Sequence, residues 1–151
     1  MKFKKVNIAL VGLGNIGSYF FNTVKRNKIN IASKTGKLPI IKYISARNKN
    51  KRRKIKFTKS QWINNPLDLV KKKDIDIIVE LVGGAGGIAK KLVFSSLKNG
   101  KHVITANKSL ISSYGDQLSV IAERNKVNLE YEASVAAGIP IIRSVKEGLI
   151  A

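Results

Sequence analysis

Short apolar runs alternate with longer stretches of helical periodicity along this chain. Apolar positions at a period of two, or in unbroken runs, predict strands, and apolar positions three and four residues apart predict helices. The pattern gives six strand candidates, of which the shortest is an apolar patch inside a basic segment: 5–11, 39–46, 55–57, 75–82, 102–105 and 127–132. The helix candidates are 15–28, 66–73, 88–98, 109–125 and 139–150, and the polar stretch 30–38 is expected to be a loop.

This alternation indicates an α/β fold built from right-handed strand–helix–strand units. We therefore predict a Rossmann-like, doubly wound parallel sheet in a single domain, for which 151 residues provide a sufficient core. No internal repeat or low-complexity linker interrupts the pattern. The last helix candidate reaches the end of the sequence without a stop signal, and we expect the chain to be cut there rather than complete.

The first strand candidate runs into a glycine motif. Residues 8–17 read IALVGLGNIG, which places three glycines between an apolar strand and a helix. Glycine permits the tight turn, the approach of a pyrophosphate to the backbone and close helix packing, and the helix N-terminus attracts anions. The motif predicts a dinucleotide site, with a glycine-rich turn of another α/β protein as the alternative. The predicted cofactor-binding residues here are Gly12, Leu13, Gly14, Asn15, Ile16 and Gly17.

Composition excludes several classes of protein. The chain contains no cysteine, so neither disulfides nor thiolate metal sites can form. The apolar run at 6–11 is too short for a signal-peptide core and carries no cleavage pattern, and no run reaches transmembrane length. We expect a cytoplasmic protein with no membrane partner.

The net charge of +20 is unusual for a domain of this size. Eight of the 29 lysines and arginines lie between Arg47 and Lys59. A basic surface suits nucleic acid, anionic lipid or acidic small molecules. Neither a nucleic-acid motif nor an aromatic stacking pattern accompanies the charge, so we expect no specific nucleic-acid partner.

Three downstream segments narrow this interpretation. They occur in a fixed order and read ELVGG at 80–84, GKHVITANK at 100–108 and YEASVAAGIPI at 131–141. Together they closely resemble the nucleotide-binding half of homoserine dehydrogenase, and the resemblance covers nearly the whole chain. It implies that residues 1–151 are the NAD(P)-binding domain and that the substrate domain and a second catalytic residue lie outside this chain.

The resemblance also implies an activity. Members of this family reduce aspartate semialdehyde to homoserine with NAD(P)H, on the route to threonine, methionine and isoleucine. A complete enzyme of this kind is expected to be a homodimer or a larger oligomer. We expect the present chain to bind nucleotide without turning over substrate alone. Two alternatives stay open, namely another NAD(P)-linked dehydrogenase and a non-catalytic nucleotide-binding module.

Positions that match the family indicate which residues lie near the nicotinamide, the reactive end of the cofactor. Val82 and Gly83 lie at the carboxyl end of a strand candidate, where nucleotide crevices open in such sheets, and a plain loop is the alternative for them. The resemblance places Thr105 and Lys108 by the nicotinamide, with Lys108 as the catalytic residue that polarises the substrate carbonyl. A cation there would stabilise negative charge that develops on oxygen. The alternative for Lys108 is a solvated surface charge.

A cation site is implied near the end of the sequence. In the family a carboxylate and backbone carbonyls of this turn hold a monovalent cation, typically sodium, and hard cations do prefer oxygen ligands. The matching residues are Glu132, Val135, Ala137 and Ile139. Ala137 stands where many relatives have glycine, and a helix-capping role for Glu132 is the alternative. His102, the only histidine, is interpreted as a packed residue rather than a ligand.

The end of the second strand bears on the choice of cofactor. An acidic residue at this point would bind the adenine ribose hydroxyls and favour NAD. The sequence instead reads SARN at 45–48, and Arg47 matches an arginine that contacts the ribose or its 2′-phosphate in relatives. Lys49, Arg52 and Arg53 add positive charge, although a solvated basic loop remains an alternative for them. NADP(H) is therefore favoured, with NAD(H) kept open.

Overall fold

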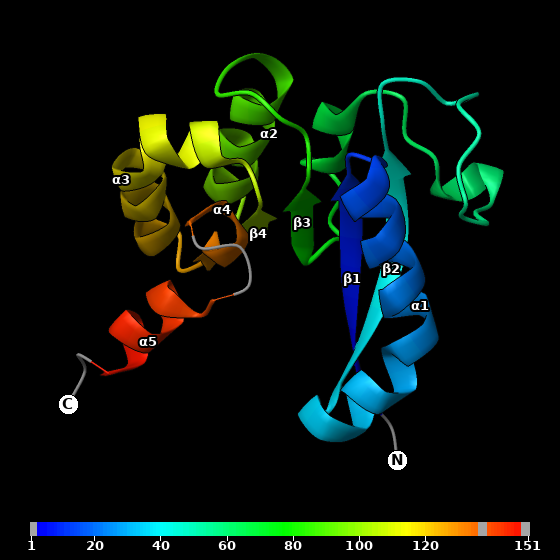
Figure 1. Ribbon diagram of the computed structural model, residues 1–151, viewed down its shortest axis with the longest axis horizontal. Coiled ribbons are helices and arrows are strands. Elements are labelled where there is room, and N and C mark those ends of the chain that lie inside the picture. The colour runs from blue at the N-terminus through cyan, green and yellow to red at the C-terminus, as the bar shows by residue number, and fades with distance from the viewer. Residues whose placement is uncertain (1–2, 136–138, 149–151) are drawn as a thin grey trace.

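The computed structural model describes residues 3–135 and 139–148, and its centre is a parallel sheet of five strands (Figure 1). The strand order is β2-β1-β3-β4-β5, and each neighbouring pair is parallel. The strands are β1 Lys4–Val11, β2 Lys37–Ser45, β3 Ile77–Glu80, β4 His102–Thr105 and β5 Leu129–Glu130. The predicted parallel α/β fold is confirmed.

The sixth strand candidate, at 55–57, is wrong. These residues form irregular backbone, and Ile55 is buried against the sheet as part of a loop. A later segment of the chain contacts the free edge of β2 instead, since the Ile63 amide donates to the Ile44 carbonyl at 2.9 Å. The apolar patch therefore supplies core side chains without joining the hydrogen-bonded ladder.

Helices and turns connect the strands. Their bounds are α1 Asn15–Thr35, η1 Lys59–Gln61, η2 Pro66–Leu69, α2 Gly87–Lys98, α3 Lys108–Arg124, α4 Glu132–Val135 and α5 Ile141–Gly148. The predicted loop at 30–38 is wrong, because α1 continues to Thr35 and β2 begins at Lys37, which leaves only Gly36 between them. Ala32 is fully buried on that last turn, and the amide of Gly36, at φ 71°, closes the helix on the Ala32 carbonyl. Among these elements no helix combines the length and apolar character needed to cross a bilayer.

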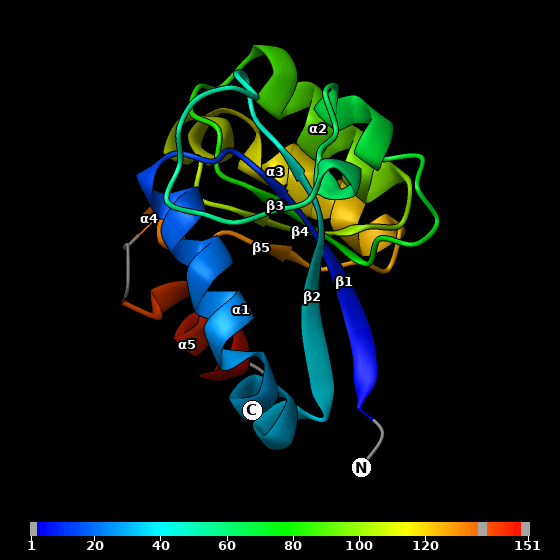
Figure 2. The ribbon, with the colours of Figure 1, turned by 90° about the vertical axis from the view of Figure 1, so that its right-hand side faces the viewer.

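α1 lies on one side of the sheet and α2 and α3 lie on the other (Figure 2), and the core is divided between these two faces. Ile8 and Leu10 pack with Phe21 and Val24 of α1 on one face. Ala9 and Val11 belong to a second cluster on the opposite face, to which α2 and α3 contribute buried leucines: Leu92, Leu97, Leu110 and Leu118. Helices therefore cover both faces of the sheet, as a doubly wound parallel sheet requires.

The order of strands fixes where a ligand can bind. The chain moves outward from β1 to β2, then returns past β1 to β3 and continues through β4 to β5. The direction of winding reverses between β1 and β3, and ligands of open α/β sheets bind outside the carboxyl ends of strands at such a switch point. The glycine motif follows β1 at that point.

Candidate functional site

Two of the three motif glycines are required by the fold itself. Gly12 has φ 99°, and a Cβ built on it would lie 2.5 Å from the carbonyl oxygen of Leu81, at the end of the neighbouring β3. A Cβ on Gly17 would collide with the Gly12 carbonyl oxygen. Both positions therefore exclude any side chain for reasons of backbone conformation and packing.

Gly14 is different from its two neighbours in the motif. A Cβ built on it would meet no atom within 4 Å, and its φ of −75° is open to any residue. It is the N-cap of α1, where no side-chain cap is formed and no acidic residue occupies the first turn. The positive end of a 21-residue helix thus faces open space at the switch point.

Three hollows lie around this point. One has a volume of about 460 Å³ and is lined by the glycine loop, the first turns of α1 and the basic segment, with Gly14 and Asn15 among its residues. The glycine-loop hollow has a volume of 310 Å³ and is lined by Gly12, Leu13, Gly14, Ala46, Arg47, Asn48, Lys51, Arg53, Leu81 and Val82. The lysine hollow has a volume of 260 Å³ and is lined by Ile16, Leu81, Val82, Gly83, Gly84, Ala106, Asn107, Lys108 and Ser109. Leu81 and Val82 line both the glycine-loop hollow and the lysine hollow, so the two adjoin each other and together make up a trough over the carboxyl ends of β1, β3 and β4.

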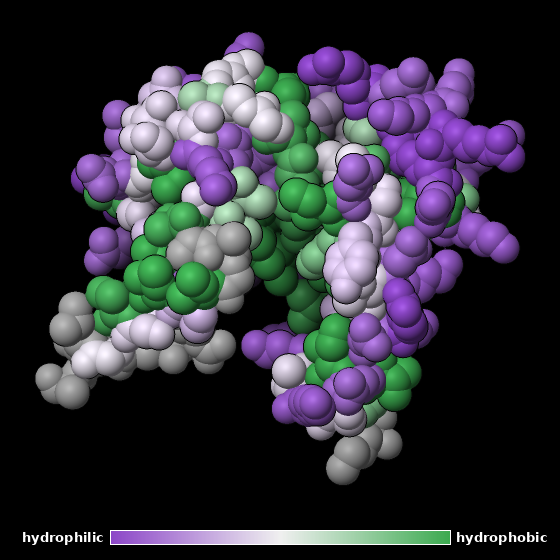
Figure 3. Space-filling model, viewed as in Figure 1, coloured by the Kyte–Doolittle hydropathy of each residue, from purple (hydrophilic) through white to green (hydrophobic). Residues whose placement is uncertain are grey.

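Basic residues border the glycine-loop hollow, and hydrophilic side chains gather over their segment in the space-filling view (Figure 3). Arg47 and Lys51 are exposed there. Arg53 is not a free charge, because its guanidinium donates to the carbonyls of Leu13 at 3.2 Å and Asn48 at 2.6 Å. It also donates to the Lys51 carbonyl at 2.9 Å and lies over the Trp62 ring. Arg53 therefore ties the basic segment to the glycine loop.

The lysine hollow is built at the start of α3. Lys108 is the first residue of that helix and is exposed. The preceding Asn107 caps the helix, since its side-chain oxygen accepts from the Leu110 amide at 3.1 Å. A cation in the first turn opposes the helix dipole. Helix stability does not account for a lysine at this position.

Sequence reasoning missed Glu80, the last residue of β3. It is fully buried, and its carboxylate accepts from the Val82 amide at 2.6 Å and from the Thr105 hydroxyl at 2.5 Å. Burial raises the pKa of Glu80, although hydrogen bonds from Thr105 and Val82 act in the opposite direction. Thr105 is only 1% exposed, so its hydroxyl serves this buried network. An acidic residue within an apolar strand was the available signal.

The predicted cation site is described only in part, because Ala137 lies outside the described residues. One carboxylate oxygen of Glu132 accepts from the Ile142 amide at 3.0 Å, at the start of α5. The Ile139 carbonyl accepts from the Ile141 amide at 2.8 Å. Val135 ends the short α4. Within 3–135 and 139–148 no three His, Cys, Asp or Glu side chains gather as metal ligands.

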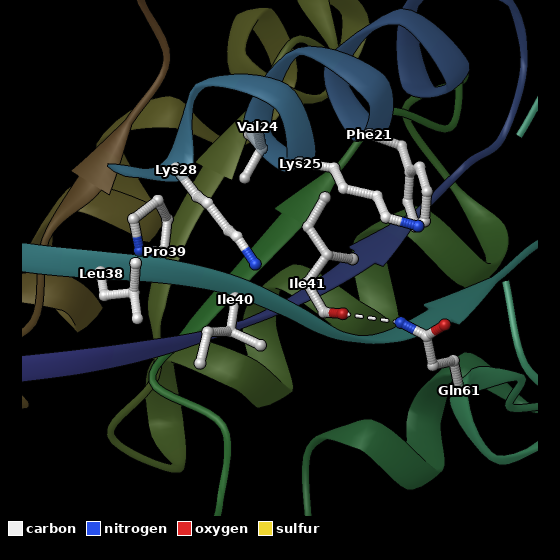
Figure 4. Close-up of a pocket in the computed structure, with 9 residues that line it drawn as sticks. All are labelled: Phe21, Val24, Lys25, Lys28, Leu38, Pro39, Ile40, Ile41 and Gln61. Atoms are coloured by element: carbon white, nitrogen blue, oxygen red, sulfur yellow. Dashed lines mark hydrogen bonds between the residues drawn. The ribbon is translucent and has the colours of Figure 1, made fainter. Parts of the chain in front are cut away.

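His102 is half-buried on β4, and its ring Nδ1 accepts from the Asn128 amide at 3.0 Å. A separate pocket of 240 Å³ lies between α1 and β2, with Phe21, Val24 and Ile41 among its apolar lining (Figure 4). Lys25 and Lys28 also line it. None of the motif residues lines this pocket, so the glycine-loop and lysine hollows remain the candidate site.

A parallel sheet with a glycine turn at its switch point defines a dinucleotide-binding α/β protein. Comparison with known proteins makes the assignment specific. Residues 12–132 match the family model described as "Homoserine dehydrogenase, NAD binding domain". The chain belongs to this family and is an oxidoreductase coenzyme domain that binds a nicotinamide cofactor.

Individual relatives agree with the family model. Homoserine dehydrogenase of Neisseria gonorrhoeae is 40% identical over 148 residues, which are 98% of this chain and 34% of the relative. The solved homoserine dehydrogenase of Thiobacillus denitrificans is 35% identical, with a TM-score of 0.85 over 98% of this chain and 34% of the other. That of S. aureus at pH 8.5 is 37% identical, with a TM-score of 0.82 over 89% and 33% of the two chains. The chain thus spans about a third of the length of these relatives.

Proposed function

We propose that this chain is the coenzyme-binding part of an enzyme that reduces aspartate semialdehyde to homoserine with a nicotinamide cofactor. The proposal includes a role in the synthesis of threonine, methionine and isoleucine, a homodimer or larger oligomer, and a substrate domain outside residues 1–151. Membership of the family supports it. The observation that carries it is the open space beside Gly14 at the helix N-terminus, next to the glycine-loop hollow that Gly14 lines.

The trough suggests a direction for the bound cofactor. The pyrophosphate would lie by Gly14 and the N-terminus of α1, where amide groups and the helix dipole favour anions. The adenosine half would occupy the glycine-loop hollow, and the nicotinamide would occupy the lysine hollow. Val82, which lines both hollows, would lie beneath the junction.

In this arrangement Lys108 serves the chemistry. The cofactor, when bound, supplies the hydride that adds to the carbonyl carbon of the substrate. Charge then develops on the carbonyl oxygen, and a fixed ammonium stabilises it. Lys108 is exposed at the rim of the lysine hollow, from which its amine can reach a substrate placed over the nicotinamide.

NADP(H) is the favoured cofactor in this proposal, with NAD(H) as the alternative. Arg47 and Lys51 border the glycine-loop hollow, and none of the described residues that line it is an acid that could hold a ribose diol. A guanidinium suits the 2′-phosphate because it donates two parallel hydrogen bonds. Arg53 contributes by shaping the loop, since its donors already hold backbone carbonyls.

The proposal keeps a sodium site at Glu132, Val135, Ala137 and Ile139. A carboxylate and backbone carbonyls are suitable donors for a hard cation. The bond from the Ile142 amide to Glu132 equally suits a helix-capping role. Melting curves of the full-length protein in sodium chloride and in tetramethylammonium chloride separate the two, because a bound cation raises the melting temperature only in sodium and only with Glu132 intact.

Steady-state kinetics of the full-length protein test the catalytic assignment. Replacement of Lys108 by Ala should lower kcat with aspartate semialdehyde at least about a hundredfold, the scale at which an electrostatic stabiliser acts. The melting temperature should stay the same or rise slightly, because a cation leaves the positive end of α3. Lys91→Ala removes an exposed lysine of α2 and should change neither quantity. Normal turnover in the Lys108 variant would return this residue to the role of a solvated charge.

A further inference from the structure

Glu80 is the one buried carboxylate among the described residues, and the two residues that follow it, Leu81 and Val82, line the lysine hollow. Val82 and Asn107, which line the hollow, are linked to it by hydrogen bonds. A buried carboxylate is costly unless its oxygens accept hydrogen bonds. Here one oxygen accepts from the Val82 amide and the other from the Thr105 hydroxyl.

Thr105 links Glu80 on β3 to the start of α3 through two hydrogen bonds. Its hydroxyl oxygen, while donating to Glu80, accepts from the backbone amide of Asn107 at 3.0 Å. Its carbonyl accepts from the Ser134 hydroxyl at 2.9 Å, which joins α4 to the same point. The donors form a chain with one direction, from Asn107 to Thr105 to Glu80, and such chains polarise one another.

Asn107 closes the network around the loop that follows β3. Its side-chain amide donates to the carbonyls of Val82 at 2.9 Å and Gly84 at 2.7 Å. Val82 is thus held at its amide by Glu80 and at its carbonyl by Asn107. The same asparagine caps α3, immediately before Lys108.

The burial of these side chains defines their role. Glu80 and Thr105 are 0% and 1% exposed, so neither side chain reaches the open hollow. Their network joins two walls of the hollow, the backbone of residues 82–84 on one side and the first turn of α3 on the other. We propose that Glu80 is a positioning residue that acts through Thr105 and Asn107 to set the width of the lysine hollow and the placement of Lys108.

This inference rests on the proposed function, because it assigns the lysine hollow to the nicotinamide. The experiment compares two ligands by calorimetric titration of this chain. NADPH carries the nicotinamide, whereas 2′-phospho-ADP-ribose presents the same phosphates and adenosine without it. The difference between the two affinities reports on the lysine hollow alone.

The variants are Glu80→Gln, Thr105→Val and Thr105→Ser. The first two break the carboxylate–hydroxyl link, and each should weaken NADPH about tenfold, the effect of leaving a buried group unsatisfied. Affinity for 2′-phospho-ADP-ribose should remain within about twofold, since that ligand stays outside the lysine hollow. Thr105→Ser keeps the hydroxyl and should restore NADPH binding.

Ser96→Ala is the matched control. Ser96 is a buried hydroxyl that donates to the Leu92 carbonyl within α2, and it lines neither hollow. It should lower the melting temperature without changing either affinity. Equal loss of both ligands in the Glu80 and Thr105 variants, or failure of Thr105→Ser to rescue, would overturn the positioning role and leave the proposed function standing. Failure of the unaltered chain to bind either ligand would overturn both.

Discussion

At the scale of single residues, each of the three motif glycines occupies its position for a different physical reason. Gly12 is fixed by its positive φ and by the nearby Leu81 carbonyl, and Gly17 by contact with Gly12. Gly14 has no such intramolecular reason. The space it leaves open is therefore the part of the motif that we propose for the cofactor.

Replacement of Gly14 by Val tests this distinction. A branched side chain would occupy the space reserved for the pyrophosphate, so NADPH affinity should fall more than tenfold, or more than about 1.4 kcal/mol. The fold should tolerate the change, because the backbone conformation is ordinary and no atom lies within 4 Å of the new Cβ. Titration and a melting curve measure the two effects.

Gly86→Val provides the matched control. Gly86 is likewise a helix N-cap with extended backbone and open surroundings, but it lines neither hollow. Its replacement should leave NADPH binding unchanged. Gly17→Ala should instead destabilise the fold, since its Cβ collides with backbone. Unchanged affinity in a folded Gly14 variant would contradict the pyrophosphate assignment.

Glu80 makes a second prediction at this scale, on the dependence of stability on pH. Burial raises its pKa in the folded chain above the ordinary 4.5. As pH rises through 4.5 the unfolded chain releases this proton first, so the free energy of unfolding falls until pH passes the folded-state pKa. Any stability that Glu80 adds is therefore fully present below pH 4.5 and declines above it.

Urea unfolding between about pH 4 and pH 8 measures this effect, because the slope with pH reports the difference in bound protons. Glu80→Gln has no such proton and should show a smaller decline above pH 4.5 than the unaltered chain. Other titrating groups are common to both proteins and cancel in the comparison. Parallel curves would mean that Glu80 titrates alike in the folded and unfolded chain.

At the scale of elements, the basic segment between β2 and η1 is held in place by one of its own charges. Arg53 donates to carbonyls on both sides of the glycine-loop hollow, Leu13 on the glycine loop and Asn48 and Lys51 on the basic segment. A lysine has a single ammonium and cannot reproduce this fork of donors. Arg47 and Lys51 remain exposed at the same hollow and can meet an anion.

Two substitutions separate these roles. Arg47→Ala should weaken NADPH more than NADH, because only NADPH carries the 2′-phosphate. Arg53→Lys should weaken both cofactors, since it loosens the whole segment while retaining the positive charge. Lys59→Ala, a change in η1 at the far end of the basic segment, should affect neither. Equal losses for the two cofactors in Arg47→Ala would mean that this arginine does not recognise the 2′-phosphate.

At the scale of the whole molecule, both hollows of the proposed cofactor site are lined by residues of this chain, and the chain spans about a third of the length of its relatives. We expect the isolated chain to bind NADPH and to show no oxidation of NADPH on addition of aspartate semialdehyde. Absorbance of NADPH measures the second quantity, with full-length protein as the positive control. Turnover by the isolated chain would show that the substrate site lies within residues 1–151.

Much of this molecule could be predicted from sequence because the signals are local. Apolar runs gave the positions of five strands, and β4 was predicted at its observed bounds of His102–Thr105. Predictions failed where the structure of a segment depends on contacts with residues distant in the sequence or on a single small residue. The helix α1 continues beyond its predicted end at residue 28 because Ala32 is buried on its last turn and Gly36 caps it. The patch at 55–57 packs on the core without pairing.

The sequence by itself determined the class of fold, the glycine turn and the lysine at the start of α3, since each depends on residues adjacent in the chain. Only the tertiary structure decided which charges are free. Arg53 reaches a carbonyl 40 residues away, and Glu80 meets a hydroxyl 25 residues away. Neither partner can be read from local spacing, because neighbouring strands and loops bring them together only once the sheet has formed. Arg53 is half-buried and Glu80 is fully buried, although residues of these types usually lie on the surface, and each is held by hydrogen bonds to distant parts of the chain.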